Sequence, residues 1–150
     1  MSTNIPKAEL HCHIEGAAPT DLVQEQALKY GVDIDHLIDG KRFVWNDFTS
    51  FLTAYDAAAA LFRSQEDYAL LAERYLESIA RQGAIYSEIF ISPDHARLAG
   101  LEPQAYVDGL GEGIRRAGEK HGIEGRMIIT CVRHFSPDAA IDVARFAAGR

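Results

Sequence analysis

Cysteine and positive charge are both scarce in this sequence of 150 residues. The two cysteines, Cys12 and Cys131, are too few for a disulfide framework, which favours a reduced, cytoplasmic protein. Lysine and arginine number 15 against 22 acidic residues, giving a net charge of −7. Binding to nucleic acid or to an anionic membrane needs a surplus of basic residues, so neither partner is expected. A small ligand without phosphate stays compatible with this charge.

Long apolar runs and low-complexity segments are lacking as well. No apolar stretch is long enough to span a bilayer, and no apolar segment follows a basic start, so we expect neither a membrane helix nor a signal peptide. The composition is otherwise ordinary for a globular protein, with 47% hydrophobic and 25% charged residues. A chain of this length can bury the core of one compact domain.

Three segments have the pattern of β-strands. Residues 7–14 alternate between polar and apolar side chains, which is the period of a strand. Residues 84–91 are rich in β-branched and aromatic residues, and residues 125–132 form a nearly continuous apolar run typical of a buried parallel strand. The sequence therefore predicts three strands separated by helical segments.

Helices are predicted between and after these strands. Asp47 and Ser64 are suitable N-caps, and Gly31 and Gly122 are suitable stops. The expected helices cover residues 20–30, 47 to about 62, 64 to about 82, 103–121 and 137–148. Residues 32–46 and 92–102 are expected to be irregular. The glycines of "GLGEG", residues 109–113, are expected to let a helix pack closely on the sheet.

Strands that alternate with helices indicate an α/β fold with a parallel sheet. Three parallel strands make a poor complete domain, and a (β/α)8 TIM barrel usually needs about 250 residues. We therefore expect residues 1–150 to be the N-terminal part of a single TIM-barrel domain, with about three βα units present.

The motif "ELHCHIEG", residues 9–16, is the candidate functional site. Residues two apart on a strand share a face with Cα atoms roughly 6.6 Å apart, so His11 and His13 can reach one metal ion. They end the first strand, and TIM-barrel active sites lie at the carboxyl ends of the strands. Glu9 and Glu15 are expected on the same face, whereas Cys12 points the other way.

Two histidines are too few for a catalytic zinc, which usually has three protein ligands and a water. Of the other four histidines, His36 is expected to be exposed and His121 to favour a helix C-terminus. His95 and His134 follow the second and third strands, where loop histidines are more often solvated than bound to metal. The missing ligands are expected after residue 150.

Four blocks of sequence carry a resemblance to a known family. "PKAELHCHIEGA" resembles the opening of the adenosine deaminase family of metal-dependent amidohydrolase barrels. "DFTSFLTAYD" is similar to the helix that covers the pocket in that family, and "GAIYSEIFISP" and "GRMIITCVRH" are similar to its second and third strands. The resemblance runs from Pro6 to at least His134.

The resemblance implies roles for individual residues. His11 and His13 would bind one zinc ion per subunit, His13 is also a candidate substrate contact, and Glu15 would hydrogen-bond the substrate. Four residues of the covering helix either line an apolar mouth or simply pack on the core: Phe48, Phe51, Leu52 and Tyr55. Ser92 and His134 are candidates for supporting positions behind the metal ligands. No catalytic acid or base of the family falls within residues 1–150.

The activity implied is zinc-dependent hydrolysis of adenosine to inosine and ammonia, with a small-molecule purine nucleoside as substrate. The alternative is an adenine deaminase that acts on the free base. "ISPD" after the second strand favours the adenosine branch, whereas Glu15, in place of the more common Asp, favours the adenine branch. A barrel phosphoesterase, with Arg133 as a phosphate contact, and a non-catalytic module also stay open.

Overall fold

The computed structural model describes residues 5–40, 42–132 and 135–149. Its main sheet has three parallel strands in the order β1, β4, β5. These strands span Lys7–His13, Ala84–Ile91 and Glu124–Ile129. A separate antiparallel hairpin joins β2 (Ile38–Asp39) to β3 (Arg42–Phe43). The α/β class and the parallel sheet that the sequence predicts are thus confirmed.

Six α-helices are found in the described residues, and four of their ends have the expected caps. Asp47 and Ser64 each form a capping box, and Gly31 and Gly122 end their helices in the left-handed conformation. The helices are α1 (Thr20–Tyr30), α2 (Phe48–Ala59), α3 (Gln65–Ala80), α4 (Pro93–Leu98), α5 (Pro103–His121) and α6 (Pro137–Ala148). Two 3-10 turns, η1 (Ile14–Ala17) and η2 (Asp35–Leu37), complete the structure.

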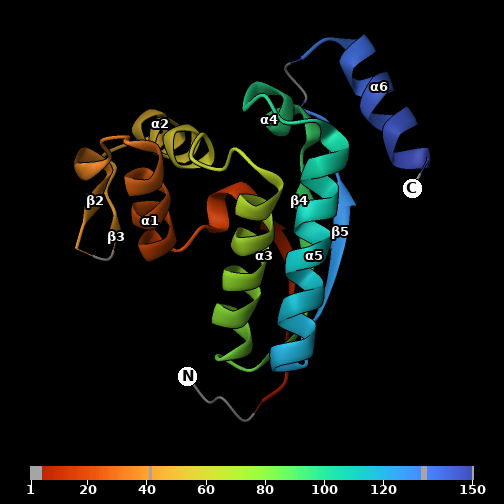
Figure 1. Cartoon of the computed structure of the whole chain (residues 1–150), viewed down its shortest axis with the longest axis horizontal. Helices are drawn as coiled ribbons and strands as arrows, with labels where there is room; N and C mark the ends of the chain where they lie inside the picture. The colour runs from red at the N-terminus through yellow and green to blue at the C-terminus, as the bar shows by residue number, and fades with distance from the viewer. Residues whose placement is uncertain (1–4, 41, 133–134, 150) are drawn as a thin grey trace.

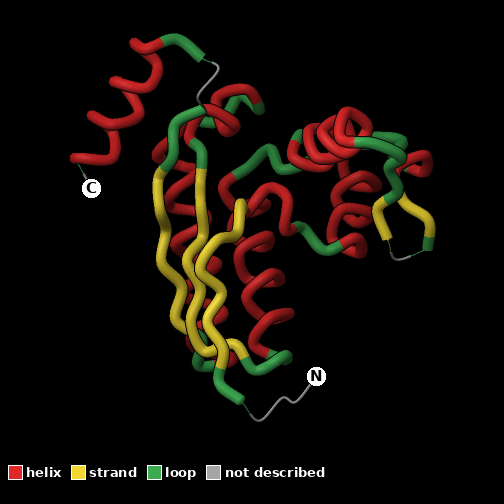
Figure 2. Tube along the Cα trace, turned by 180° about the vertical axis from the view of Figure 1, so that it is seen from behind, coloured by secondary structure: helices red, strands yellow, loops and turns green. Residues whose placement is uncertain are grey.

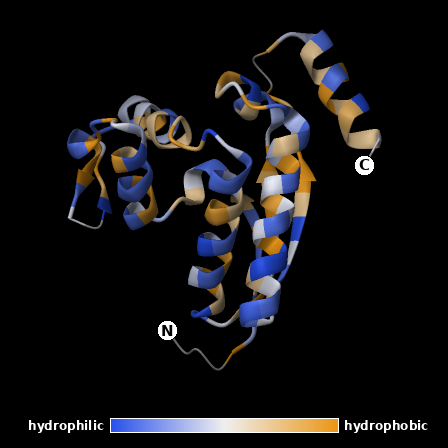
Figure 3. Ribbon diagram, viewed as in Figure 1, coloured by the Kyte–Doolittle hydropathy of each residue, from blue (hydrophilic) through white to orange (hydrophobic). Residues whose placement is uncertain are grey.

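The sheet is covered on one face only. Helices α3 and α5 lie side by side against it (Figure 1), and the strands are uncovered when the molecule is seen from behind (Figure 2). Buried side chains from the sheet and from these helices form the core, among them Leu71, Leu76, Ile89, Ile91 and Leu110. The outward surfaces of α3 and α5 are mostly hydrophilic (Figure 3), as expected for helices that bury one stripe.

Glycines allow α3 and α5 to approach each other closely. A Cβ atom on Gly113 would lie 2.1 Å from the Ala69 carbonyl oxygen, and one on Gly109 would lie 2.3 Å from the Gln65 carbonyl oxygen. The expectation that these glycines pack against the sheet is therefore wrong for both. Only Gly111 is near the sheet, where its Cβ would meet Met127 at 3.9 Å.

Three segments differ from the sequence-based expectation. Residues 92–102 contain α4, since Ser92 precedes a proline at the first helical position and a short helix has too few residues to show a hydrophobic period. Residues 32–46 contain η2 and the small hairpin. Strand β5 ends at Ile129 instead of residue 132.

None of the helices in the described part of the chain combines the length and apolar content that a bilayer crossing requires.

Candidate functional site

His11 and His13 lie together at the carboxyl end of β1, on the uncovered face of the sheet. Their ring centroids are 5.4 Å apart. Phe90, which pairs with His13 across the β1–β4 ladder, stacks on the His11 ring at 4.2 Å and lies 5.4 Å from the His13 ring. The alternation of β1 thus places both imidazoles on one face, as the motif predicts.

The spacing of the two imidazoles fits a shared metal ion. Nitrogens about 2.0–2.1 Å from a tetrahedral zinc put the two ring centres roughly 5 Å apart. The observed 5.4 Å is close to this separation. Within the described residues no group of three or more potential metal ligands is found.

Glu15 does not share the face of the histidines, contrary to the expectation. Strand β1 ends at His13, and the 3-10 turn η1 that follows breaks the alternation and directs Glu15 inward. Only 1% of Glu15 is exposed. Tyr106 donates a hydrogen bond to Glu15 Oε1 at 2.5 Å, and Tyr55 donates to Oε2 at 3.4 Å. The carboxylate is therefore held between α5 and α2.

Tyr106 is a site residue that the sequence did not single out. It is completely buried, and its hydroxyl also accepts a hydrogen bond from the Ser92 backbone amide at 3.0 Å. Tyr68 packs edge-on against it, with ring centroids 4.6 Å apart. Burial and the neighbouring Glu15 charge raise the pKa of Tyr106 well above its ordinary value, so the phenol stays protonated. In the sequence, the position of Tyr106 on the apolar stripe of its helix predicts a core residue and gives no sign of a role in the site.

Several buried polar groups follow β4, and one of them lies near this carboxylate. His95 lies on α4, and its Nδ1 is 3.9 Å from Glu15 Oε1, which is too long for a hydrogen bond. Among the described residues, His95 Nδ1, Ser92 Oγ and Asp94 Oδ2 are buried without a hydrogen-bond partner. Ser92 thus lies near the site, but its side chain contacts neither histidine by a hydrogen bond.

The remaining histidine predictions have different outcomes. His121 ends α5, with Nε2 3.7 Å from Glu77 Oε1, which agrees with a structural role at a helix end. His36 is exposed in η2. His134 and Arg133 lie outside the described residues.

The four residues of α2 expected at an apolar mouth separate into two groups. Phe51 and Tyr55 line a cavity of about 60 Å³ beside Glu15, together with Trp45 from the segment before α2. Phe48 does not line it and is 72% exposed, and Leu52 faces a different cleft, which includes His95. Burial and Glu15 raise the pKa of Tyr55 above its ordinary value, so this phenol also stays a donor.

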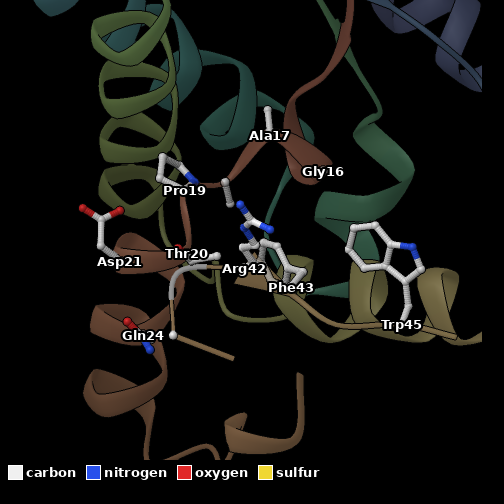
Figure 4. Close-up of a pocket in the computed structure, with 11 residues that line it drawn as sticks. Gly16, Ala17, Pro19, Thr20, Asp21, Gln24, Arg42, Phe43 and Trp45 are labelled. Carbon is white, nitrogen blue, oxygen red and sulfur yellow. The ribbon is translucent and has the colours of Figure 1, made fainter. Parts of the chain in front are cut away.

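A larger open cleft of about 900 Å³ lies next to this cavity, between α1, η1 and β3. Figure 4 shows Arg42 and Phe43 in its middle, with the Arg42 guanidinium extending toward the segment of Ala17 and Pro19. Trp45 closes one side. Ligand pockets usually measure about 300–1,000 Å³, so this cleft has the size of a ligand pocket, whereas the cavity beside Glu15 is smaller in the part of the barrel that the structure describes.

A comparison with models of known families identifies the family of this chain. The family model described as Adenosine deaminase matches residues 6–150. The chain therefore belongs to the adenosine deaminase family, as the resemblance of its opening motif indicated.

Individual relatives show which members of the family this chain is similar to. An adenine deaminase of Chelativorans sp. (strain BNC1) is 65% identical over 142 residues, covering 95% of this chain and 44% of the relative. An adenine deaminase of Rhizobium meliloti (strain 1021) is 54% identical over 150 residues, covering 100% of this chain and 46% of the relative. The chain thus spans less than half the length of these relatives.

Solved structures agree with the fold. The crystal structure of an adenine deaminase from Arthrobacter aurescens matches with a TM-score of 0.81 and 26% identity, over 95% of this chain and 44% of that one. An amidohydrolase from Burkholderia ambifaria, solved with bound Zn, matches with a TM-score of 0.84 and 25% identity, over 98% of this chain and 41% of that one. The fold is that of the N-terminal part of a metal-dependent (β/α)8 barrel.

The relatives correct the main prediction of substrate. The sequence analysis favoured adenosine because "ISPD" follows the second strand, but the relatives with 54% and 65% identity are named adenine deaminases. The prediction of adenosine is therefore wrong. The physical reason is that Ser92 is buried and its amide donates to Tyr106, so packing accounts for this residue without a substrate contact, and it is a poor reporter of specificity.

Proposed function

We propose that the protein containing this chain hydrolyses adenine to hypoxanthine and ammonia. The observation that carries the proposal is the 65% identity to the Chelativorans adenine deaminase, which extends over 95% of the chain. The acidic net charge of −7 fits a small neutral base better than a nucleic acid. We further propose that residues 1–150 are the N-terminal part of one barrel domain and that the enzyme works in the reducing cytoplasm.

His11 and His13 would hold one zinc ion per subunit. In support, their centroid separation of 5.4 Å suits a common tetrahedral ion, and the Burkholderia ambifaria structure contains Zn. Bound zinc lowers the pKa of water toward about 7 and so supplies hydroxide at neutral pH. Phe90 stacks on His11 and restricts the orientation of its ring. The other ligands and the catalytic acid or base would come from the rest of the barrel.

Glu15 and His13 would contact the substrate. Both oxygens of Glu15 accept hydrogen bonds from tyrosines, so its free lone pairs select a ligand that offers a donor. Glu15 is also one methylene longer than the Asp common in the family, and it is held in place by Tyr55 and Tyr106. A longer, fixed carboxylate leaves less room for a ribose, which favours the free base.

The test uses a full-length chimera, called the carrier enzyme below. In it, this sequence replaces the 142 matching residues of the Chelativorans adenine deaminase, and the rest of that protein is kept. Ammonia release is measured with adenine and with adenosine. We expect turnover of adenine and a kcat/KM for adenosine lower by about 100-fold or more, since a site built for a hydrogen-bond donor rejects an analogue without it. Turnover of adenosine alone would contradict the proposal.

A further inference from the structure

We propose that Tyr106 is a positioning residue that determines specificity: it fixes the Glu15 carboxylate so that the carboxylate accepts the ring N–H of a free purine base. This inference rests on the proposed function and adds a residue to it. Tyr106 lies on α5, 91 positions from Glu15 in the sequence, and it is completely buried.

The direction of the Tyr106 hydrogen bond is fixed by its second partner. A phenol hydroxyl has one proton and can also accept. The Ser92 backbone amide can only donate, so the Tyr106 oxygen accepts from Ser92 and its single proton is directed to Glu15 Oε1. Rotation of the hydroxyl about its C–O bond would break the bond to Glu15. Tyr106 thus links the end of β4 to the carboxylate after β1 in one defined arrangement.

Tyr55 fixes the second carboxylate oxygen from the opposite side. Its hydroxyl donates to Glu15 Oε2 at 3.4 Å. The Tyr55 ring also lies over Gly16, where an added Cβ would be 2.5 Å from Tyr55 Cε2. Two helices therefore hold the two oxygens, and the missing side chain at Gly16 makes room for one of the two rings.

The chemistry of the ligand follows from this arrangement. Both tyrosines donate, so a carboxylate held by them has only acceptor capacity left. Free adenine has an N–H in its five-membered ring. In an N9-substituted adenine a carbon substituent takes the place of that hydrogen, so the ring nitrogen cannot donate. Placing the substituted ring against Glu15 would leave a buried hydrogen-bond acceptor facing an apolar group, which is unfavourable. A fixed carboxylate discriminates more strongly because it cannot turn away.

The experiment compares adenine with 9-methyladenine, because the methyl group removes the N–H and adds little volume. Tyr106→Phe is made in the full-length carrier enzyme, with Tyr68→Phe as the matched control. Tyr68 is equally buried and packs on Tyr106, but its hydroxyl makes no hydrogen bond to Glu15. Both variants keep the ring and lose only one oxygen. Kinetics and the thermal midpoint are measured for each.

For Tyr106→Phe we expect KM for adenine to rise ~10-fold with kcat within ~3-fold, since the lost interaction acts on binding. The preference for adenine over 9-methyladenine should fall by at least ~10-fold. Tyr68→Phe should leave both quantities within ~2-fold of the parent. A Tyr106→Phe enzyme with the parent's preference, or with kcat/KM for both substrates lowered by one common factor, would overturn the inference.

A second variant keeps the test decisive if Tyr106→Phe does not fold. Glu15→Asp shortens the carboxylate so that it cannot reach the Tyr106 hydroxyl, and it should also lower the preference for adenine. An unchanged preference overturns the inference while the proposed function stands. A parent carrier enzyme that does not hydrolyse adenine overturns the proposed function itself, so the two failures are distinguishable.

Discussion

At the scale of single residues, buried carboxylates connect elements that are far apart in the sequence. Asp67, 2% exposed, lies in the first turn of α3 and accepts hydrogen bonds from Lys29 and Tyr30 of α1, each at 2.5 Å. It also accepts from the backbone amides of Arg63 and Ser64, each at 3.0 Å. One side chain therefore caps α3 and fastens α1 to it.

Replacement of Asp67 tests this connection and its dependence on pH. Burial raises the pKa of the Asp67 carboxyl, but the hydrogen bonds from Lys29 and Tyr30 and from the backbone outweigh burial, so the pKa lies below its ordinary value. We expect Asp67→Asn to lower the free energy of unfolding by about 2 kcal/mol at pH 7, measured by urea denaturation of the full-length carrier enzyme.

The sign of the pH effect follows from linkage. Because the folded pKa is depressed, the stabilisation is fully present above the unfolded value near 4 and is lost as pH falls through the folded pKa. The difference between parent and Asp67→Asn should therefore shrink below about pH 4. Asp39→Asn, on the exposed β2, should change the free energy of unfolding by less than about 0.5 kcal/mol. A difference that stays constant with pH would contradict this account.

At the scale of elements, the contact between α3 and α5 decides how tightly the helical layer covers the sheet. Gly109 and Gly113 are one turn apart on α5 and both face backbone carbonyls of α3. Ion pairs continue the contact, with Arg116 bonded to the exposed Glu66 at 2.7 Å and Lys120 bonded to the buried Glu73. An exposed pair such as Arg116–Glu66 contributes little, so close packing at the glycines is expected to stabilise the contact more than this pair does.

Two alanine substitutions on α5 separate packing from helix propensity. Gly113→Ala would bring a Cβ within 2.1 Å of the Ala69 carbonyl oxygen, so we expect it to destabilise by about 1–3 kcal/mol through overpacking. Gly111→Ala meets only Met127 at 3.9 Å and should be neutral or stabilising by up to about 1 kcal/mol. Thermal unfolding of both variants measures the contrast. Equal midpoints would show that the two helices are free to move apart.

At the scale of the whole molecule, the uncovered face of the sheet carries the two histidines proposed as metal ligands. Figure 2 shows the strands bare on this side. The rings of His11, His13 and Phe90 contact one another on the face opposite to the buried β4 side chains of Ile89 and Ile91. In a (β/α)8 barrel this face is the interior, and it is filled by side chains from the other strands. The relatives are about twice as long as this chain, which leaves room for those strands.

Metal removal tests the molecule as a whole. Dialysis of the full-length carrier enzyme against a chelator should remove about one zinc per subunit, abolish ammonia release and lower the thermal midpoint, because the ion binds only the folded state. Added zinc should restore all three. His11→Ala and His13→Ala should each lower the zinc content measured by elemental analysis. Cys131→Ser, which changes an exposed thiol, should leave it unchanged. Full activity without metal would refute the assigned ligands.

The sequence alone determined the longer elements and the paired histidines. Capping residues and hydrophobic period are local, so the helices over 20–30, 103–121 and 137–148 and the strand over 84–91 have the predicted bounds. The two-residue period of a strand likewise placed His11 and His13 on one face. The family resemblance, from Pro6 onward, came from the same local blocks.

Only the tertiary structure decided what surrounds Glu15. The end of β1 and the turn η1 changed the direction of this side chain, and Tyr55 and Tyr106 reach it from helices 40 and 91 positions away. Nothing in the local sequence distinguishes Tyr106 from other core tyrosines, because its partner depends on how α5 packs against the end of β4. Hydrogen bonds between distant elements follow from packing, and packing depends on the whole core at once.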